Sequence, residues 1–311
     1  MVNSITLDAY KELAKRNASA IFAIMGKYYH NNEEAGMYAR NLRPKYLENG
    51  VIPTFYINAH DATELLRNGA ETIHIELEQT DGEAPSHDVL AVIEGTEKPE
   101  ESIVITGHFD SLPIGPGAWD NATGSAALMG LYLYFKQNPP KRTLRFVWCG
   151  AEEQGLLGSK AWVAAHKDEL EKHVLMVNVD VAAPILGTNA VPVLATPAAV
   201  GYIDSMMREA GIAADVKLDI YSSDCIPFAD NGVPAVNFCR FGPQGAGFIH
   251  DRRDNLKNKY LSEAALDITL QQVLVFAKRI DSAVVFPIAR ELCDEIKGKV
   301  DKYLFKKPEK K

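Results

Sequence analysis

Five segments of the sequence place side chains that can bind metal ions at the end of an apolar, strand-like run or in the loop after it. An isolated histidine or aspartate usually has only a structural role. When ionisable groups gather at the ends of buried strands, however, each charge needs a compensating partner. The segments carry His108 with Asp110, Asp120 with Asn121, the pair Glu152 and Glu153, Asp180, and His250 with Asp251 and Asp254.

These donors are imidazoles and carboxylates, without a thiolate. Such a set suits zinc, manganese or cobalt in a catalytic site rather than a structural zinc held by cysteines. The donors suffice for two divalent ions, with one glutamate of the pair left over. Two ions close together need a bridging ligand, and a carboxylate can turn one oxygen toward each ion. The remaining glutamate is then available as a general base.

Strands joined by crossover helices must position these segments. From about residue 100, β-rich apolar runs alternate with helical patterns, which predicts an α/β fold with a mixed, mostly parallel central sheet between two helical layers. The expected strands are Ser102–Thr106, Thr143–Trp148, Val174–Val181, Val191–Ala195, Asp215–Ile220 and Ala235–Phe238. The expected helices are Ala122–Phe135, Leu157–His166, Pro197–Ala210, Ser262–Ile280 and Pro287–Tyr303.

The N-terminal part has a different pattern and predicts a small α/β appendage over residues 1–84, followed by the main domain over residues 85–311. A polar segment, Asp81–Ser86, is the expected linker. The appendage is expected to contain a helix over Leu7–Arg16, strands over Ala20–Met25, Val51–Asn58 and Thr72–Gln79, and a polar loop over His30–Arg43.

Composition and charge limit the kinds of partner and the cellular compartment that we expect for this protein. The chain has 311 residues, a formal net charge of −8 and a pI of about 5.6. No dense stripe of Lys and Arg precedes the lysine-rich last residues, so no nucleic-acid partner is expected. No apolar run is long enough to span a bilayer, and no secretory signal pattern opens the chain. Four scattered cysteines fit reduced thiols in the cytoplasm, although a Cys225–Cys239 bridge stays open as an alternative.

The segments that carry these donors resemble the M28 family of zinc aminopeptidases. The resemblance runs from about Asp88 to about Phe286. Residues 1–84 resemble the later part of the protease-associated (PA) domain that accompanies some members. The matching motifs are His108-Phe-Asp-Ser, Ala118-Trp-Asp-Asn-Ala-Thr-Gly124, Glu152-Glu-Gln-Gly-Leu-Leu-Gly-Ser159, Asn178-Val-Asp180, Ser223-Asp224 with Pro227-Phe228, and His250.

The resemblance implies two zinc ions and a peptide substrate with a free N-terminus, hydrolysed by an exopeptidase. His108 and Asp180 would hold one ion, Glu153 and His250 would hold the other, and Asp120 would bridge them. Glu152 would be the general base. Asp110 would orient His108 through a hydrogen bond. An unusual cis peptide would join Asp120 to Asn121.

The chain departs from the family pattern beside the last histidine. Some members carry a tyrosine there as the donor that stabilises the oxyanion, but this chain has Ile249. Tyr221, Ser222 and Arg240 are the candidates for that donor. Cys225 stands where members often have a histidine after the Ser-Asp pair.

Three other hypotheses remain open. A carboxypeptidase or dipeptidase of the related M20 family shares the donor set, but the extra domain of that family is not visible between Asp180 and His250. A glutaminyl-cyclase-like acyltransferase would use a single zinc ion, so metal stoichiometry separates it. A non-catalytic binding module would have lost ligands, whereas here every ligand and the base are present. Self-association also stays open.

Overall fold

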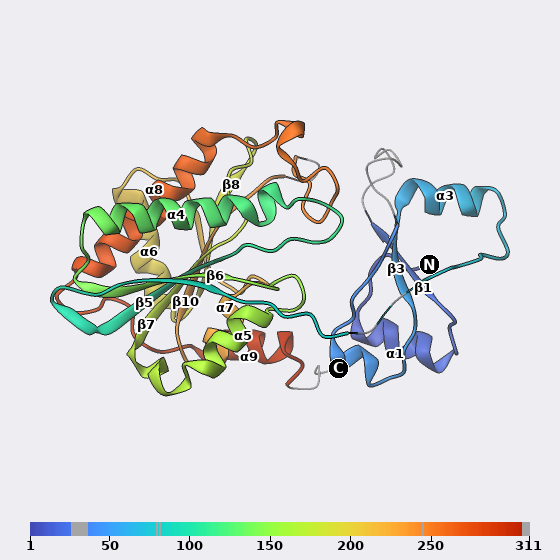
Figure 1. The fold of residues 1–311 in the computed structure, drawn as a ribbon, viewed down its shortest axis with the longest axis horizontal. Coiled ribbons are helices and arrows are strands. Elements are labelled where there is room, and N and C mark those ends of the chain that lie inside the picture. Colours follow the sequence, from blue (N-terminus) through green and yellow to red (C-terminus); the bar gives the residue numbers. More distant parts are fainter. Residues whose placement is uncertain (26–36, 79, 81, 244–245, 307–311) are drawn as a thin grey trace. The chain divides into compact units, whose positions relative to one another are not determined.

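The computed structural model describes residues 1–25, 37–78, 80, 82–243 and 246–306, and the chain folds as two compact units (Figure 1). One unit contains Met1–Pro85 and Asp251–Arg253. The other contains Ser86–His250 and Asp254–Lys311. The interpretation of residues 1–84 as a PA-like domain stays a prediction.

The second unit is built on a seven-stranded sheet with the order β4-β6-β5-β7-β10-β8-β9. Pairs β5/β6, β5/β7, β7/β10 and β8/β9 are parallel, whereas β4/β6 and β8/β10 are antiparallel. This confirms the expected mixed, mostly parallel sheet. The strands are β4 (Val89–Ile93), β5 (Lys98–His108), β6 (Arg142–Cys149), β7 (His173–Val179), β8 (Thr188–Leu194), β9 (Asp215–Leu218) and β10 (Ala235–Phe241).

Helices cover both faces of this sheet and confirm the three-layer architecture (Figure 1). Because side chains alternate along a strand, Ile103 and Ile105 of β5 enter one core and Val104 enters the other. The first core packs against α4 (Thr123–Gln137), α6 (Pro197–Glu209) and α8 (Glu263–Ser282). The second core packs against α5 (Leu157–Ala165), α7 (Cys225–Asp230) and α9 (Asp294–Tyr303). Short turns of other helix types are η1 (Ala118–Ala122), η2 (Lys167–Lys172) and η3 (Leu256–Asn258).

Two expectations for this unit need correction, and two elements were not predicted. The last helix begins at Asp294, not at Pro287, and Cys293 occupies its N-cap position. All four cysteines are free thiols, so the Cys225–Cys239 bridge is absent. The sequence pattern predicted neither the edge strand β4 nor the short helix α7. Both are too short for their periodicity to stand out.

The first unit has a three-stranded sheet of order β1-β3-β2, in which β1 and β3 are parallel and β2 is antiparallel to β3. Phe22, Phe55, Ile57 and Ala62 form a small core. The elements are α1 (Leu7–Lys15), β1 (Ile21–Met25), β2 (Tyr38–Ala39), α2 (Pro44–Leu47), β3 (Thr54–Asn58) and α3 (Ala59–Arg67).

The strand expected at Thr72–Gln79 is wrong over residues 72–78, which form no strand in the structure. Ile73 and Leu77 alternate with polar residues, but both side chains are exposed. An alternating pattern becomes a strand only where another strand accepts its backbone hydrogen bonds. Gln79, Asp81 of the linker and residues 30–36 of the expected loop lie outside the described residues.

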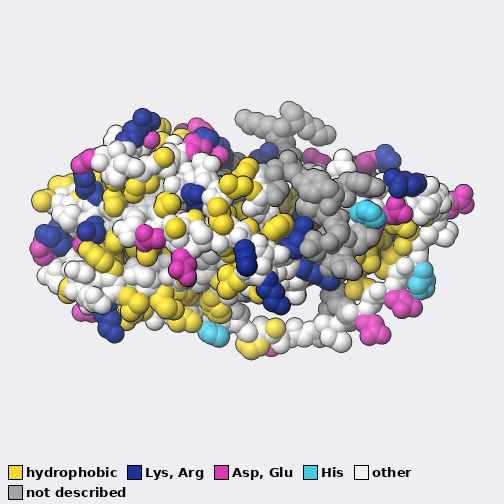
Figure 2. All heavy atoms as spheres, turned by 90° about the horizontal axis from the view of Figure 1, so that it is seen from above, with side chains coloured by type: hydrophobic (Ala, Val, Ile, Leu, Met, Phe, Trp, Pro, Cys, Tyr) yellow, Lys and Arg dark blue, Asp and Glu magenta, His cyan; other side chains and the backbone are white. Residues whose placement is uncertain are grey.

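On the face drawn in Figure 2, Lys and Arg side chains lie scattered among acidic and apolar ones. In the part of the chain that the structure describes, no helix is both long and apolar enough to cross a membrane.

A buried histidine makes the stability of the second unit depend on pH. His173 is fully buried, its Nδ1 lies 2.6 Å from Oγ of Ser102, and its Nε2 has no hydrogen-bond partner among the described residues. Burial, together with the Arg145 guanidinium, lowers the pKa of His173 to about 4. As the pH falls below 6.5 the unfolded chain therefore takes up a proton before the folded chain does.

We expect this group to cost about 2 kcal/mol of unfolding free energy between pH 7.5 and pH 5. Urea unfolding of the chelated protein at both pH values measures the loss, and His173→Gln should reduce it by that amount. His74→Gln, on the exposed surface of the first unit, is the matched control. An unchanged pH dependence in His173→Gln would contradict the assignment.

Candidate metal centre

The first predicted ligand, His108, ends β5 and is buried. Its Nδ1 lies 3.1 Å from the backbone carbonyl oxygen of Asp110 and 3.4 Å from the Asp110 carboxylate. Both neighbours are acceptors, so Nδ1 carries the proton and the lone pair of Nε2 is free to bind a metal ion. Nε2 lies 3.1 Å from Oδ1 of Asp120 and 3.5 Å from Oδ1 of Asp180.

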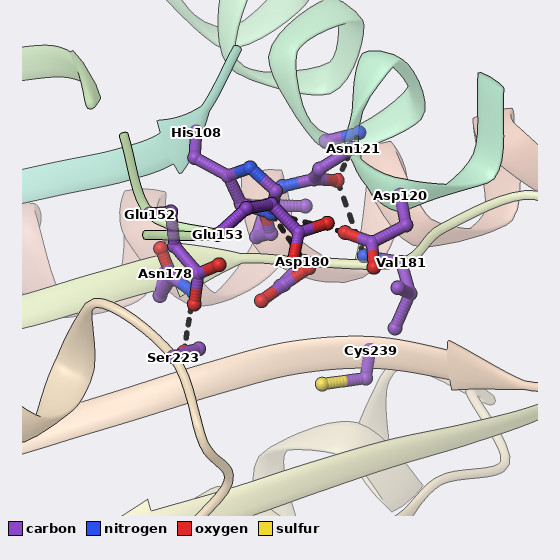
Figure 3. A network of polar contacts seen from close by, with 12 residues as sticks. His108, Asp120, Asn121, Glu152, Glu153, Asn178, Asp180, Val181, Ser223 and Cys239 are labelled. Atoms are coloured by element: carbon purple, nitrogen blue, oxygen red, sulfur yellow. Dashed lines mark hydrogen bonds and ion pairs between the residues drawn. The ribbon is translucent and has the colours of Figure 1, made fainter. Parts of the chain in front are cut away.

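Asp120 lies in η1, the short turn before α4, and is buried. The expected cis peptide joins it to Asn121. The Asn121 side chain donates to the carbonyl oxygen of Val179 and accepts from the amides of Gly124 and Val181. This turn is thereby tied to the end of β7, which delivers Asp180 (Figure 3).

The glutamate pair follows β6 in a turn that starts at Ala151, whose φ is +53°. The two oxygens of Asp110 accept the backbone amides of Glu152 and Glu153 at 3.0 and 3.1 Å. Asp110 therefore holds the turn that carries both glutamates, besides lying beside His108. The sequence predicted the contact with His108 but not the two amide bonds.

His250 is the most exposed of the predicted ligands, with 45% of its side chain accessible. Its Nε2 lies 3.1 Å from Oδ2 of Asp120 and 3.3 Å from Oε2 of Glu153. The two oxygens of Asp120 thus face different histidines, because Oδ1 faces His108 and Oδ2 faces His250.

The five predicted ligands accordingly form two groups that share Asp120. His108, Asp120 and Asp180 form one group, and Asp120, Glu153 and His250 form the other, with the ligand atoms of each group within 4.8 Å of one another. Oδ1 of Asp180 is buried and accepts no hydrogen bond from a described residue. An imidazole and carboxylate set with such an orphaned oxygen fits a zinc ion in each group.

The close contacts between the histidines and the carboxylates shift the pKa values of both. Burial alone would lower the pKa of His250, but hydrogen bonds to Asp120 and Glu153 raise it to about 10. Burial alone would raise the pKa of Asp120, but the two histidines hold it below its usual range. A divalent cation would displace the second proton of each imidazole, so metal binding must depend on pH.

Glu152 belongs to neither ligand group, although it lies in the same cluster (Figure 3). Burial raises its pKa well above the usual range, and the negative charges of Asp180 and Glu153 act in the same direction. A buried carboxylate beside the ligands but without a ligand role is a candidate for the general base.

Two further acids at the centre were named in the sequence without a role. Asp254 accepts backbone amides of the turn that carries Asp120. Asp224 is fully buried, and burial raises its pKa to about 6. In the sequence, Asp224 belongs to one of the matching motifs and Asp254 to the segment of His250, but neither position indicated these contacts.

Comparison with known proteins agrees with this geometry. Residues 88–277 match the model of peptidase family M28. The chain is 28% identical to aminopeptidase YwaD of Bacillus subtilis over 252 residues, covering 76% of this chain and 52% of that protein. It is 34% identical to carboxypeptidase Q of Mus musculus over 136 residues, covering 42% of this chain and 29% of that protein. The chain thus spans about half of the length of the first relative and less than a third of the second.

Solved structures share the fold. A peptidase M28 precursor from Shewanella amazonensis superposes with a TM-score of 0.70 at 24% identity, covering 94% of this chain and 69% of that one. The zinc aminopeptidase BSAP from Bacillus subtilis gives a TM-score of 0.66 at 21% identity, covering 95% and 72%. The family model covers more than half of the sequence and includes all five predicted ligands and Glu152, so the chain belongs to peptidase family M28.

Proposed function

We propose that the protein is a zinc-dependent aminopeptidase with two zinc ions, which removes residues from the free N-terminus of a peptide. The observation that carries the proposal is the shared Asp120, whose two oxygens face His108 and His250 on opposite sides. A carboxylate in this position can join two ions. Manganese or cobalt fits the same ligands.

The residues of the centre would have distinct roles in this reaction. His108, Asp120 and Asp180 would hold one ion, and Asp120, Glu153 and His250 the other. When bound, the ions supply Lewis acidity, which acidifies water and polarises the peptide carbonyl. Glu152 takes a proton from the attacking water and passes it to the leaving amine, so that one water and one peptide give one acid and one amine.

Among the three candidates for the oxyanion donor, the contacts favour Tyr221. The Ser222 hydroxyl is paired with the Tyr303 hydroxyl at 2.6 Å. The Arg240 guanidinium donates to the carbonyl of Pro184 and the side chain of Asn189. Burial raises the pKa of Tyr221, and the negative charges of Asp180, Asp120 and Glu152 act in the same direction, so this tyrosine lies near the ligand cluster.

The relatives also support a second candidate, because part of the chain is 34% identical to carboxypeptidase Q of Mus musculus. A glutaminyl cyclase shares the fold with a TM-score of 0.56 at 19% identity. The substrate and the metal stoichiometry distinguish these alternatives from an aminopeptidase.

The proposed activity should require both a metal and a free amino terminus. We expect the chelated protein to be inactive, two equivalents of zinc to restore hydrolysis of aminoacyl-4-nitroanilides, and N-acetylated analogues to be inert. Elemental analysis and a substrate panel measure this. One zinc per chain would favour the cyclase-like alternative, and a folded chain that binds no metal would refute the enzyme.

Replacing the base should remove turnover and leave the metal in place. Glu152→Gln is expected to lower kcat by about 10²- to 10⁴-fold, because the amide cannot accept the proton of water. Its zinc content should equal that of the original chain. Glu153→Gln is the comparison, since loss of a ligand should reduce zinc content as well. Near-normal hydrolysis by Glu152→Gln would show that another group is the base.

The oxyanion assignment is tested by Tyr221→Phe, which removes one hydroxyl. We expect kcat to fall by about 10²-fold with little change in KM, because the lost bond strengthens in the transition state. Ser222→Ala, whose hydroxyl is paired with Tyr303, is the matched control and should change kcat less than twofold, roughly. Equal effects of the two substitutions would contradict the assignment.

A further inference from the structure

Asp254 is a buried carboxylate outside both ligand groups, yet it contacts the turn that carries the shared ligand. Its Oδ1 accepts the amide of Trp119 at 2.6 Å, and its Oδ2 accepts the amide of Asp120 at 3.0 Å. Its own carbonyl oxygen accepts the amide of Ala118 at 3.3 Å. Three consecutive amides of η1 therefore donate to one residue.

Neighbouring side chains hold Asp254 and this turn in place. The Tyr260 hydroxyl donates to Oδ1 of Asp254 at 2.5 Å, and the Tyr260 ring packs edge-on against Trp119. On the other side of the turn, the Thr123 hydroxyl donates to the carbonyl oxygen of Trp119. These contacts fix the peptide units before Asp120, and with them the position of the Cα atom from which its carboxylate projects.

Asp110 makes the same type of contact elsewhere in the centre. It lies two residues after His108 and accepts the amides of Glu152 and Glu153, whereas Asp254 lies four residues after His250 and accepts those of Trp119 and Asp120. Each histidine segment therefore carries a carboxylate that is not a ligand but holds the backbone of a carboxylate ligand.

We propose that Asp254 is a positioning residue, which fixes the backbone before Asp120 so that both oxygens of that shared ligand point into the two ion sites. The inference rests on the proposed two-zinc centre. Asp254 would act through the positions of its two oxygens and not through its negative charge alone. Removing the contact should weaken zinc binding, because a ligand that is free to turn must lose that freedom when the ion binds.

Two substitutions separate geometry from charge. Asp254→Asn keeps the shape of the side chain but replaces one carboxylate oxygen by an NH₂ group. That group would face at least one of the three present donors, which are Trp119 N, Asp120 N and Tyr260 Oη. Asp254→Glu keeps the charge but displaces the carboxylate by one methylene, so it cannot meet both amides at their present distances. The proposal requires that both variants bind zinc more weakly, by about 10- to 100-fold.

Asp281 offers a matched control at the start of β6. It is buried, and its two oxygens accept the amides of Lys141 and Arg142 at 3.0 and 2.8 Å. Asp281→Asn breaks the same kind of paired contact at the end of β6 opposite to the glutamate turn. Its zinc affinity should stay within about twofold of the original, although its thermal stability falls.

The experiment measures zinc dissociation constants by competition with a chromophoric chelator, and the Tm of each variant with and without zinc. The difference in Tm between the zinc-bound and metal-free forms of the same variant separates the effect on zinc binding from a general loss of stability. If Asp254→Asn does not fold, Tyr260→Phe removes one hydrogen bond to the same carboxylate and should weaken zinc binding several-fold.

Affinity in Asp254→Asn within twofold of the original, or full affinity in Asp254→Glu, would overturn the proposal. If the variants gave that result while the original chain bound two zinc ions and hydrolysed its substrate, the proposed function would still stand. An original chain that binds no zinc would refute the proposed function and this inference together.

Discussion

The second unit is organised around a concentration of carboxylate side chains. Asp120, Glu152, Glu153 and Asp180 meet at one edge of the sheet, with two imidazoles between them. Coulomb repulsion between carboxylates at such distances is strong where water is excluded. Cations bound among these groups would relieve that repulsion.

The sheet makes this concentration possible because parallel strands deliver their following residues to one edge. β5, β6 and β7 are neighbours, and they end in His108, the glutamate turn and Asp180. Two separate apolar cores hold the strands from both sides, so their ends cannot move apart when like charges repel one another. Burial of apolar side chains in the two cores thus stabilises an arrangement in which like charges lie close together at the sheet edge.

Hydrogen bonds to backbone amides stabilise the parts of the site that lie outside the strands. The turns that carry Asp120 and the glutamate pair have irregular backbones, and their amides would lack partners. Carboxylates of Asp254 and Asp110 accept these amides. Acidic side chains in this centre therefore serve two purposes, since some face the ion sites and others stabilise the turns behind them.

The types of side chain at the centre follow from the sequence alone. Strand ends and the loops after them supplied the candidate donors, and the resemblance of their motifs to peptidase family M28 assigned the five ligands and Glu152. Local patterns also predicted most strands and helices of the second unit, because β-branched runs and helix signals act over a few residues. They failed at residues 72–78, where an alternating pattern found no partner strand.

Only the tertiary structure decided how these residues meet. Trp119 and Asp254 are 135 residues apart in the chain, and no local pattern links them. Their contact forms where two distant segments of the folded chain meet, and Asp120 faces His108 with one oxygen and His250 with the other. The type of a side chain is local information, whereas its hydrogen-bond partners depend on which distant segments lie side by side.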